Sequence, residues 1–124
     1  MKKHLLLSAF ILLGLASCTN EATLVNTAEN MKTPEMQALD KAFKSLGDPK
    51  NRATAEELKS GSAELSDRRK ELLVPASKAL IVSTGVSEAE ITKQTGGDIT
   101  KIIVWAVKIN LKKKEEISKK FVQN

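Results

Sequence analysis

The hydrophobic positions of this chain change their pattern after the first eighteen residues. Residues 5–15 are almost wholly apolar, and the polar sequence after residue 18 shows little periodicity until residue 33. Beyond that point apolar residues recur at spacings of three and four, which is the period of an amphipathic helix. The pattern therefore predicts three parts: an apolar segment over residues 1–17, a polar tether over residues 18–33 and a helical domain over residues 34–124.

The first helix of the domain is predicted over residues 34–46. Thr33 precedes Pro34, a residue that suits the first position of a helix, and Gly47 follows as a stop signal. The apolar residues between these signals lie at spacings of three, four and three: Met36, Leu39, Phe43 and Leu46.

The segment after residue 54 is predicted to form one long helix or two. Thr54 and Glu57 have the spacing of a capping box, which marks a helix start. Pro75 lacks an amide proton and disfavours helical geometry at Val74, so we expect a kink or a break there. Apolar residues recur every seven positions along this segment: Leu58, Leu65, Leu72 and Ala79.

A short capped helix is expected after Gly85, running through Gln94 and ending at the Gly96-Gly97 pair. Its start has the spacings of both a capping box and a hydrophobic staple, formed by Val86, Ser87, Glu90 and Ile91.

The last segment, from residue 99 onward, fits two periodicities. Residues 103, 105, 107, 109 and 111 are apolar and alternate as a strand would, whereas residues 99, 102, 103, 106 and 107 form a helical stripe. The segment contains no Gly or Pro, and the chain offers no comparable strand to pair with it. We therefore predict a helix capped by Asp98, apolar on most sides at its centre and packed in the core. The predicted fold class is all-α, a small bundle of three to five helices, and the alternative is α+β with a strand around residues 102–111.

The first seventeen residues have the three-part layout of a secretory signal peptide. Lys2 and Lys3 give a positive start, the apolar run follows, and the small residues Ala16 and Ser17 precede Cys18. A transmembrane helix needs roughly 20 apolar residues. The run is shorter than that, so a cleaved signal is favoured over a membrane span.

The four residues Leu15 to Cys18, LASC, resemble the lipobox of bacterial lipoproteins. The resemblance covers residues 1–18 only. It implies a diacylglyceryl group on the Cys18 sulfur, cleavage between Ser17 and Cys18, and acylation of the new N-terminus. Two other readings compete with it. In the first, Cys18 is a free thiol or forms a disulfide; because it is the only cysteine, that disulfide would have to be intermolecular. In the second, the signal is cut after Ala16 or Ser17 without lipidation.

Lipidation at Cys18 would fix the location of the mature protein. One acyl chain gives only reversible binding and stable anchoring takes roughly two, so the implied form should stay in the membrane. Some bacteria retain lipoproteins at the inner membrane through an Asp after the cysteine; the residue here is Thr19, which favours the outer membrane. The tether would span roughly 20 Å as a coil and about 50 Å when extended.

The composition of the mature chain argues against most catalytic and metal sites. Its only histidine, His4, leaves with the signal, and the chain has no tyrosine. Ser-His and Cys-His nucleophiles and His- or Cys-ligated zinc are therefore excluded. Glu56-Glu57 and Glu115-Glu116 offer adjacent carboxylates, but both pairs lie in charged, polar surroundings. We predict a protein that is not an enzyme and has no cofactor and no metal.

Nucleic acid is not expected as a partner. Residues 90–103 resemble the core of a helix-turn-helix in their spacing. However, Gly97 stands where a core-filling residue belongs, and Ile103, Val104 and Trp105 occupy the face that should read bases. Removal of Lys2 and Lys3 leaves 18 basic and 15 acidic side chains, a net charge of only +3.

A basic cluster near the C-terminus is a candidate contact for anionic phosphates of lipid or lipopolysaccharide. The alternative is a solvated end of a helix, where cations complement the helix dipole. The residues concerned are Lys112, Lys113, Lys114, Lys119 and Lys120.

The sequence as a whole predicts a lipid-anchored, non-enzymatic lipoprotein of the bacterial cell envelope. It would present a small helical binding domain to an envelope protein or a wall component. The lipid anchor would attach the protein to the membrane. The alternative is a structural spacer or assembly subunit that oligomerises through its helices, using Leu58, Leu65 and Leu72.

Replacing Cys18 by Ala is expected to abolish lipidation, because only a thiolate side chain forms the thioether. Intact-mass measurement of the protein isolated from its native envelope should show a gain of roughly two or three acyl chains in the wild type and none in Cys18→Ala. An unlipidated wild-type mass would contradict the lipobox assignment.

Overall fold

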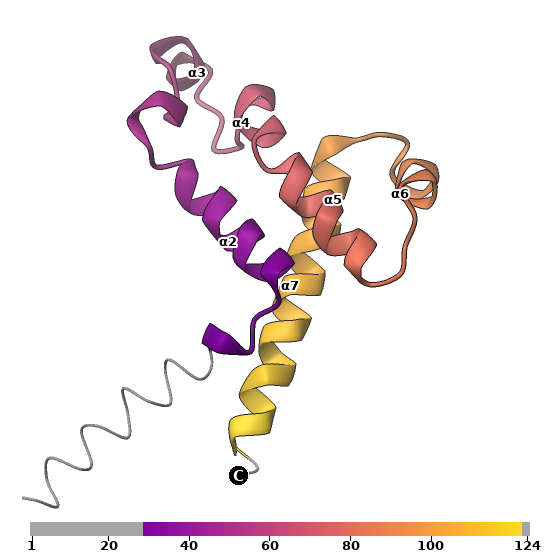
Figure 1. Ribbon diagram of the computed structural model, residues 1–124. Helices are drawn as coiled ribbons and strands as arrows, with labels where there is room; N and C mark the ends of the chain where they lie inside the picture. Colours follow the sequence, from indigo (N-terminus) through magenta and orange to yellow (C-terminus); the bar gives the residue numbers. More distant parts are fainter. Residues whose placement is uncertain (1–28, 123–124) are drawn as a thin grey trace, which may run out of the picture. The chain divides into compact units, whose positions relative to one another are not determined.

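The structure, a computed structural model, describes residues 29–122 (Figure 1). The predicted signal segment, Cys18 and the tether up to residue 28 lie outside the described residues. The chain divides after Lys32, and the unit from Thr33 onward contains the helices named below. The described residues form helices and no strand, which confirms the all-α class.

Helix α2, Pro34–Ser45, begins and ends within one residue of its prediction. The Thr33 hydroxyl caps it by accepting the Met36 amide proton at 3.2 Å. Met36 and Leu39 are buried, and Leu46 is the C-cap. The Gly47 amide donates to the Lys44 carbonyl, and Pro49 then begins a short 3-10 helix, η1, Pro49–Asn51.

The segment after residue 54 forms three helices, where one or two were expected. They are α3, Ala55–Lys59, α4, Asp67–Glu71, and α5, Val74–Ser83. The predicted break near Val74 is present, since α4 ends three residues before it and α5 begins at it. Gly61, with φ of +66°, turns the chain away after α3.

The seven-residue leucine repeat does not form a common face. Leu58 on α3 is 70% exposed, Leu72 at the end of α4 is 39% exposed, and Ala79 of α5 is exposed. The buried residues of α4, of α5 and of the turn between them are instead Lys70, Leu73, Ser77, Leu80 and Ile81. The prediction of one or two helices over this segment was therefore wrong, because the chain leaves the helix between Leu58 and Leu65 and again after Glu71.

Helix α6, Glu88–Thr95, is capped as predicted by the Ser87 hydroxyl, which accepts the Glu90 amide proton at 3.2 Å. The Glu90 carboxylate does not complete the capping box; it accepts a hydrogen bond from the Gln94 side chain at 2.8 Å. Gly96, with φ of +64°, ends the helix in the left-handed conformation that glycine adopts most readily.

Helix α7, Ile99–Val122, is the longest described helix, with 24 residues. Asp98 caps it as predicted, with Oδ1 accepting the amide protons of Thr100 and Lys101. The alternative strand over residues 102–111 is wrong. Ile102, Ala106 and Asn110 are the buried positions of α7, and their spacing of four is that of a helix.

The core lies where α2, α5 and α6 meet α7 (Figure 1). Helix α5 packs along α7, and α2 packs against α5 and is bonded to α7 through side chains. A fully buried Leu or Ile contributes roughly 1.5–3 kcal/mol. The core side chains are Met36, Leu39, Leu80, Ile81, Ile91, Ile102 and Ala106.

A polar contact joins α2 to α7 beside this core. Asn110, 6% exposed, donates from Nδ2 to Asp40 Oδ1 at 3.2 Å, and Lys114 pairs with the same oxygen at 2.9 Å. A buried side-chain amide is costly without a partner, so this contact favours one register of α2 on α7.

Replacing Leu80 by Ala should lower the free energy of unfolding by about 2–5 kcal/mol, because it leaves a cavity in the core. Ser77→Ala, less than one turn away on the same fully buried face, is the matched control. The Ser77 hydroxyl has no hydrogen-bond partner, so its removal should not lower stability. Equal losses in the two variants, measured by urea unfolding, would contradict this description of the core.

Candidate functional site

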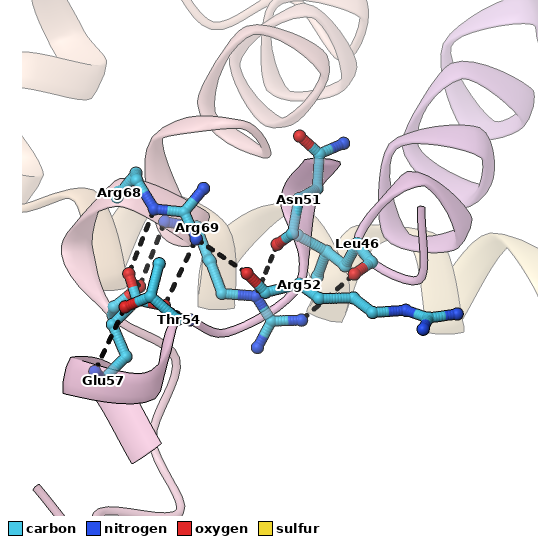
Figure 2. A network of polar contacts seen from close by, with 8 residues as sticks. Leu46, Asn51, Arg52, Thr54, Glu57, Arg68 and Arg69 are labelled. Carbon is cyan, nitrogen blue, oxygen red and sulfur yellow. Dashed lines mark hydrogen bonds and ion pairs between the residues drawn. The ribbon is translucent and has the colours of Figure 1, made fainter. Parts of the chain in front are cut away.

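The segment from Leu46 to Lys70 has the most elaborate polar structure in the described part of the chain. Helices η1 and α3 bury no residue, so apolar packing does not hold this segment in place. Two arginines at adjacent positions of α4, Arg68 and Arg69, hold it instead (Figure 2).

Arg69 binds backbone carbonyls that precede it by many residues. Its Nε donates to the Asn51 carbonyl at 3.1 Å and its Nη2 donates to the Leu46 carbonyl at 3.2 Å. Leu46 is the last residue of the α2 turn and Asn51 ends η1, so one guanidinium ties α4 to the end of α2 and to η1. The carbonyls at a helix end lack partners within the helix, and an arginine satisfies them well.

Arg68 forms a two-point contact with Glu57 of α3, shown at the left of Figure 2. Its Nε lies 3.0 Å from Glu57 Oε1 and its Nη2 lies 3.2 Å from Oε2, and Nη2 also donates to the Arg52 carbonyl at 2.9 Å. The Ser66 hydroxyl donates to Glu57 Oε1 as well, at 2.9 Å. Such a bidentate pair fixes orientation in addition to distance.

Glu57 also completes the capping box of α3. Its Oε2 accepts the Thr54 amide proton at 2.8 Å, and the Thr54 hydroxyl accepts the Glu57 amide proton at 3.2 Å. The hydrogen bond from Arg68 and then that from the Thr54 amide lower the pKa of Glu57 from 4.5 to about 2. The carboxylate is therefore charged at neutral pH and fully occupied, which makes it a structural group and not a general acid.

A pocket of about 350 Å³ lies beside this network, between α3 and α4. Its wall is rich in hydroxyl and carboxylate groups. Leu58 of α3, the helix that contributes Glu57 to this wall, is 70% exposed. Lys70 and Glu64 pair across the pocket wall, and this hydrogen bond raises the pKa of Lys70. The lining residues are Glu57, Ser60, Ser62, Glu64, Leu65, Ser66, Asp67 and Lys70.

One carboxylate of each pair considered for catalysis has another role in the structure. Glu57 serves Arg68 and the capping box, as described. Glu115 pairs with Lys119 at 2.8 Å, one turn along α7, and this hydrogen bond lowers the pKa of Glu115. Residues 29–122 contain no cluster of His, Cys, Asp and Glu side chains that could hold a metal ion.

The five C-terminal lysines proposed as a phosphate contact do not form one group. Lys114 turns toward α2 and pairs with Asp40, and Lys119 pairs with Glu115. Lys112 and Lys120 are exposed, and Lys113 is half-buried. The cluster in the sequence therefore divides over several sides of α7, and Lys114 has a structural role.

The arginine contacts were not identified in the sequence. Glu57 was noted for its spacing from Thr54, but Arg68 and Arg69 bind groups 11 to 23 residues earlier in the chain. No local spacing signals such a contact. The adjacent pair Arg68-Arg69 was the only hint in the sequence.

Comparison with protein-family models, curated proteins and solved structures finds no match for this chain. In the part of the chain from Glu29 to Val122, no helix combines the length and apolar character needed to cross a membrane.

The substitution Glu57→Gln should make the free energy of unfolding depend less on pH in the acid range. The lowered pKa means that the charged form of Glu57 stabilises the folded state above pH 4.5, and that this contribution is lost as the pH falls toward about 2. The variant should therefore be less stable than wild type at pH 7, with a difference that closes between pH 4.5 and 2 in urea unfolding.

The control for this experiment is Glu56→Gln, which removes the same charge one residue away. Glu56→Gln should change the stability at pH 7 less than Glu57→Gln does, because Arg68 pairs with Glu57. A difference for Glu57→Gln that stays constant with pH would contradict the assignment.

Proposed function

We propose that this protein is a lipid-anchored lipoprotein of the bacterial cell envelope and that its helical domain binds an envelope partner, either a protein or a wall component. The observation that carries the anchor is the sequence of Leu15–Cys18, directly after the apolar run. The outer membrane is favoured by Thr19 after the cysteine. The lipid would keep the helical unit at the membrane surface.

The pocket end of the domain, defined as residues 54–70, is the part that we propose contacts the partner. It combines a pocket of about 350 Å³ with an exposed Leu58 and a wall of hydroxyl and carboxylate groups. Pockets that bind ligands start at roughly 300 Å³. Hydroxyls and carboxylates bind amines and hydroxyls, which both basic peptide segments and wall polymers carry.

The arginine contacts support a binding role for this end. Five hydrogen bonds from Arg68 and Arg69 hold a segment that buries no apolar side chain in η1 or α3. A surface that is already held in one conformation loses less entropy on binding than a flexible one. We infer a preorganised recognition surface.

A non-enzymatic role is part of the proposal. The mature chain has no histidine, and Glu57 is engaged by Arg68, Ser66 and Thr54. Glu115 is likewise paired. The spacer alternative depended on a leucine stripe, and those leucines lie on separate elements, so no observation favours it over a binding role.

Affinity capture from the native envelope tests this proposal. Wild-type protein should recover a partner, and Cys18→Ala should lose both the acyl chains and the partner. Leu58→Arg should keep the acyl chains and lose the partner, because it replaces the exposed apolar side chain with a positive charge that repels the amines of the partner. The recovered material is analysed for both protein and wall fragments.

Val82→Arg is the matched control, since Val82 is also exposed, at 42%, but lies on α5 outside the pocket end. It should keep both lipid and partner. Recovery of the same partner by Leu58→Arg would rule out the pocket end as the contact, and an unlipidated wild-type protein would rule out the anchor.

A further inference from the structure

One side of α7 is left uncovered by the other helices of the unit. Val104 is 46% exposed and Leu111 is 61% exposed, although both lie in the helix that forms the centre of the core. Lys101, Lys108 and Lys112 are exposed as well, and Trp105 is half-buried with part of its side chain packed on the core. We call this set of six residues the lysine face of α7.

The lysine face is a continuous strip and not a scatter of exposed side chains. Lys101, Val104, Lys108 and Leu111 follow one another at spacings of three, four and three. Lys101, Trp105, Lys108 and Lys112 form a second row at spacings of four, three and four. Residues three and four apart are neighbours on a helix surface, so the two rows, which share Lys101 and Lys108, form one strip. From Lys101 to Lys112 the strip is about 17 Å long.

The charge of this strip is positive throughout. It contains three ammonium groups and no carboxylate. Acids lie at both ends of the strip: Asp98 caps the first turn of α7, and Glu115 and Glu116 follow Lys112 by three and four residues, with Glu115 paired to Lys119. Lys114, by contrast, pairs with Asp40 of α2. The structure thus separates the lysines that build the fold from those that face outward.

We propose that the lysine face docks on the anionic phospholipid headgroups of the membrane that carries the lipid anchor. Lysines bind headgroup phosphates while their alkyl stems lie against apolar surface. Val104 and Leu111 would enter the boundary between headgroups and acyl chains, and Trp105 would lie at that boundary, which tryptophan prefers. This inference rests on the proposed anchor, which keeps the face near the headgroups so that a weak contact suffices.

Charge complementarity favours anionic headgroups over a second copy of the chain as the binding partner of the lysine face. If two lysine faces met, the three lysines of one copy would oppose the three lysines of the other, and like charges in contact are unfavourable. A protein interface also has an apolar centre with a polar rim. Here apolar and cationic residues alternate along the strip, an arrangement that suits the headgroup region.

Trp105 provides the measurement, because it is the only tryptophan in the chain. The full-length lipidated protein is reconstituted in vesicles whose acyl chains are brominated, which quenches tryptophan at the membrane. Two vesicle compositions are compared: phosphatidylcholine alone, and phosphatidylcholine mixed with phosphatidylglycerol. We expect loss of Trp105 fluorescence in the mixed vesicles, no loss in phosphatidylcholine, and recovery at high salt, which screens the lysines.

Charge reversal identifies the face. The triple variant Lys101→Glu, Lys108→Glu and Lys112→Glu should float with the vesicles through its lipid but show no quenching. The matched control reverses three other exposed lysines, Lys41, Lys44 and Lys50, and should be quenched like wild type. The milder Leu111→Ser variant should reduce quenching, and far-UV circular dichroism verifies that each variant is folded.

The outcomes separate docking from anchoring. If the protein floats with anionic vesicles but Trp105 is not quenched, the docking proposal is overturned and the anchor is still supported. If Trp105 fluorescence then responds to polyglutamate, the lysine face binds an acidic protein and not the membrane. Flotation and quenching in anionic vesicles alone would support docking and contradict the anchor. The docking proposal is also overturned if the protein floats with neither vesicle composition, or if Trp105 is quenched equally in both. Equal loss of quenching in the lysine-face triple variant and in the control triple variant has the same consequence.

Discussion

Ile102 and Ala106 of α7 are buried against α5, and the rest of the helical unit is arranged around that contact. Helix α7 is long and partly apolar, so its apolar side must be covered. The short helix α5 packs against it and supplies Leu80 and Ile81. Helices α2 and α6 then add Met36, Leu39 and Ile91 to the same cluster. Each further element is placed by the apolar surface that the first pair leaves open.

The polar groups at the edge of this core decide between otherwise similar packings. Apolar contacts are not directional, so α2 could slide along its neighbours with little loss. The bond from Asn110 to Asp40 resists such a slide, because it would leave a buried amide without its partner. Arg68 and Arg69 act in the same way on the segment from Leu46 to Lys70, where no apolar core exists. In both places hydrogen-bond geometry supplies the specificity that hydrophobic burial lacks.

The same division of labour connects the fold to its proposed role. A single long helix contributes one side to the core and leaves another, cationic side free, while a separate segment held by arginines carries the pocket. If the lysine face rests on headgroups, the domain has a fixed orientation on the membrane instead of turning freely on its tether. An oriented domain presents its pocket end in a defined direction, which reduces the entropy lost when a partner binds.

The sequence by itself determined where α2, α3, α6 and α7 begin, because helix caps are local. Thr33, Thr54, Ser87 and Asp98 each accept an amide proton two or three residues ahead, and such contacts can be read from spacing alone. Gly96 ends its helix through its own backbone freedom. The proposed lipid site at Cys18 rests on the sequence too.

Only the tertiary structure decided which periodic residues enter the core and which lysines stay free. The leucine repeat was misleading because periodicity assumes an unbroken helix, and the chain turns at Gly61 between Leu58 and Leu65. Of the candidate site, the sequence indicated Glu57 and the basic character of α7. It could not indicate that Lys114 pairs with Asp40 or that Arg69 binds Leu46, since these partners are 74 and 23 residues apart in the chain. Contacts between distant residues depend on how whole helices pack, and no local pattern in a single sequence specifies that packing.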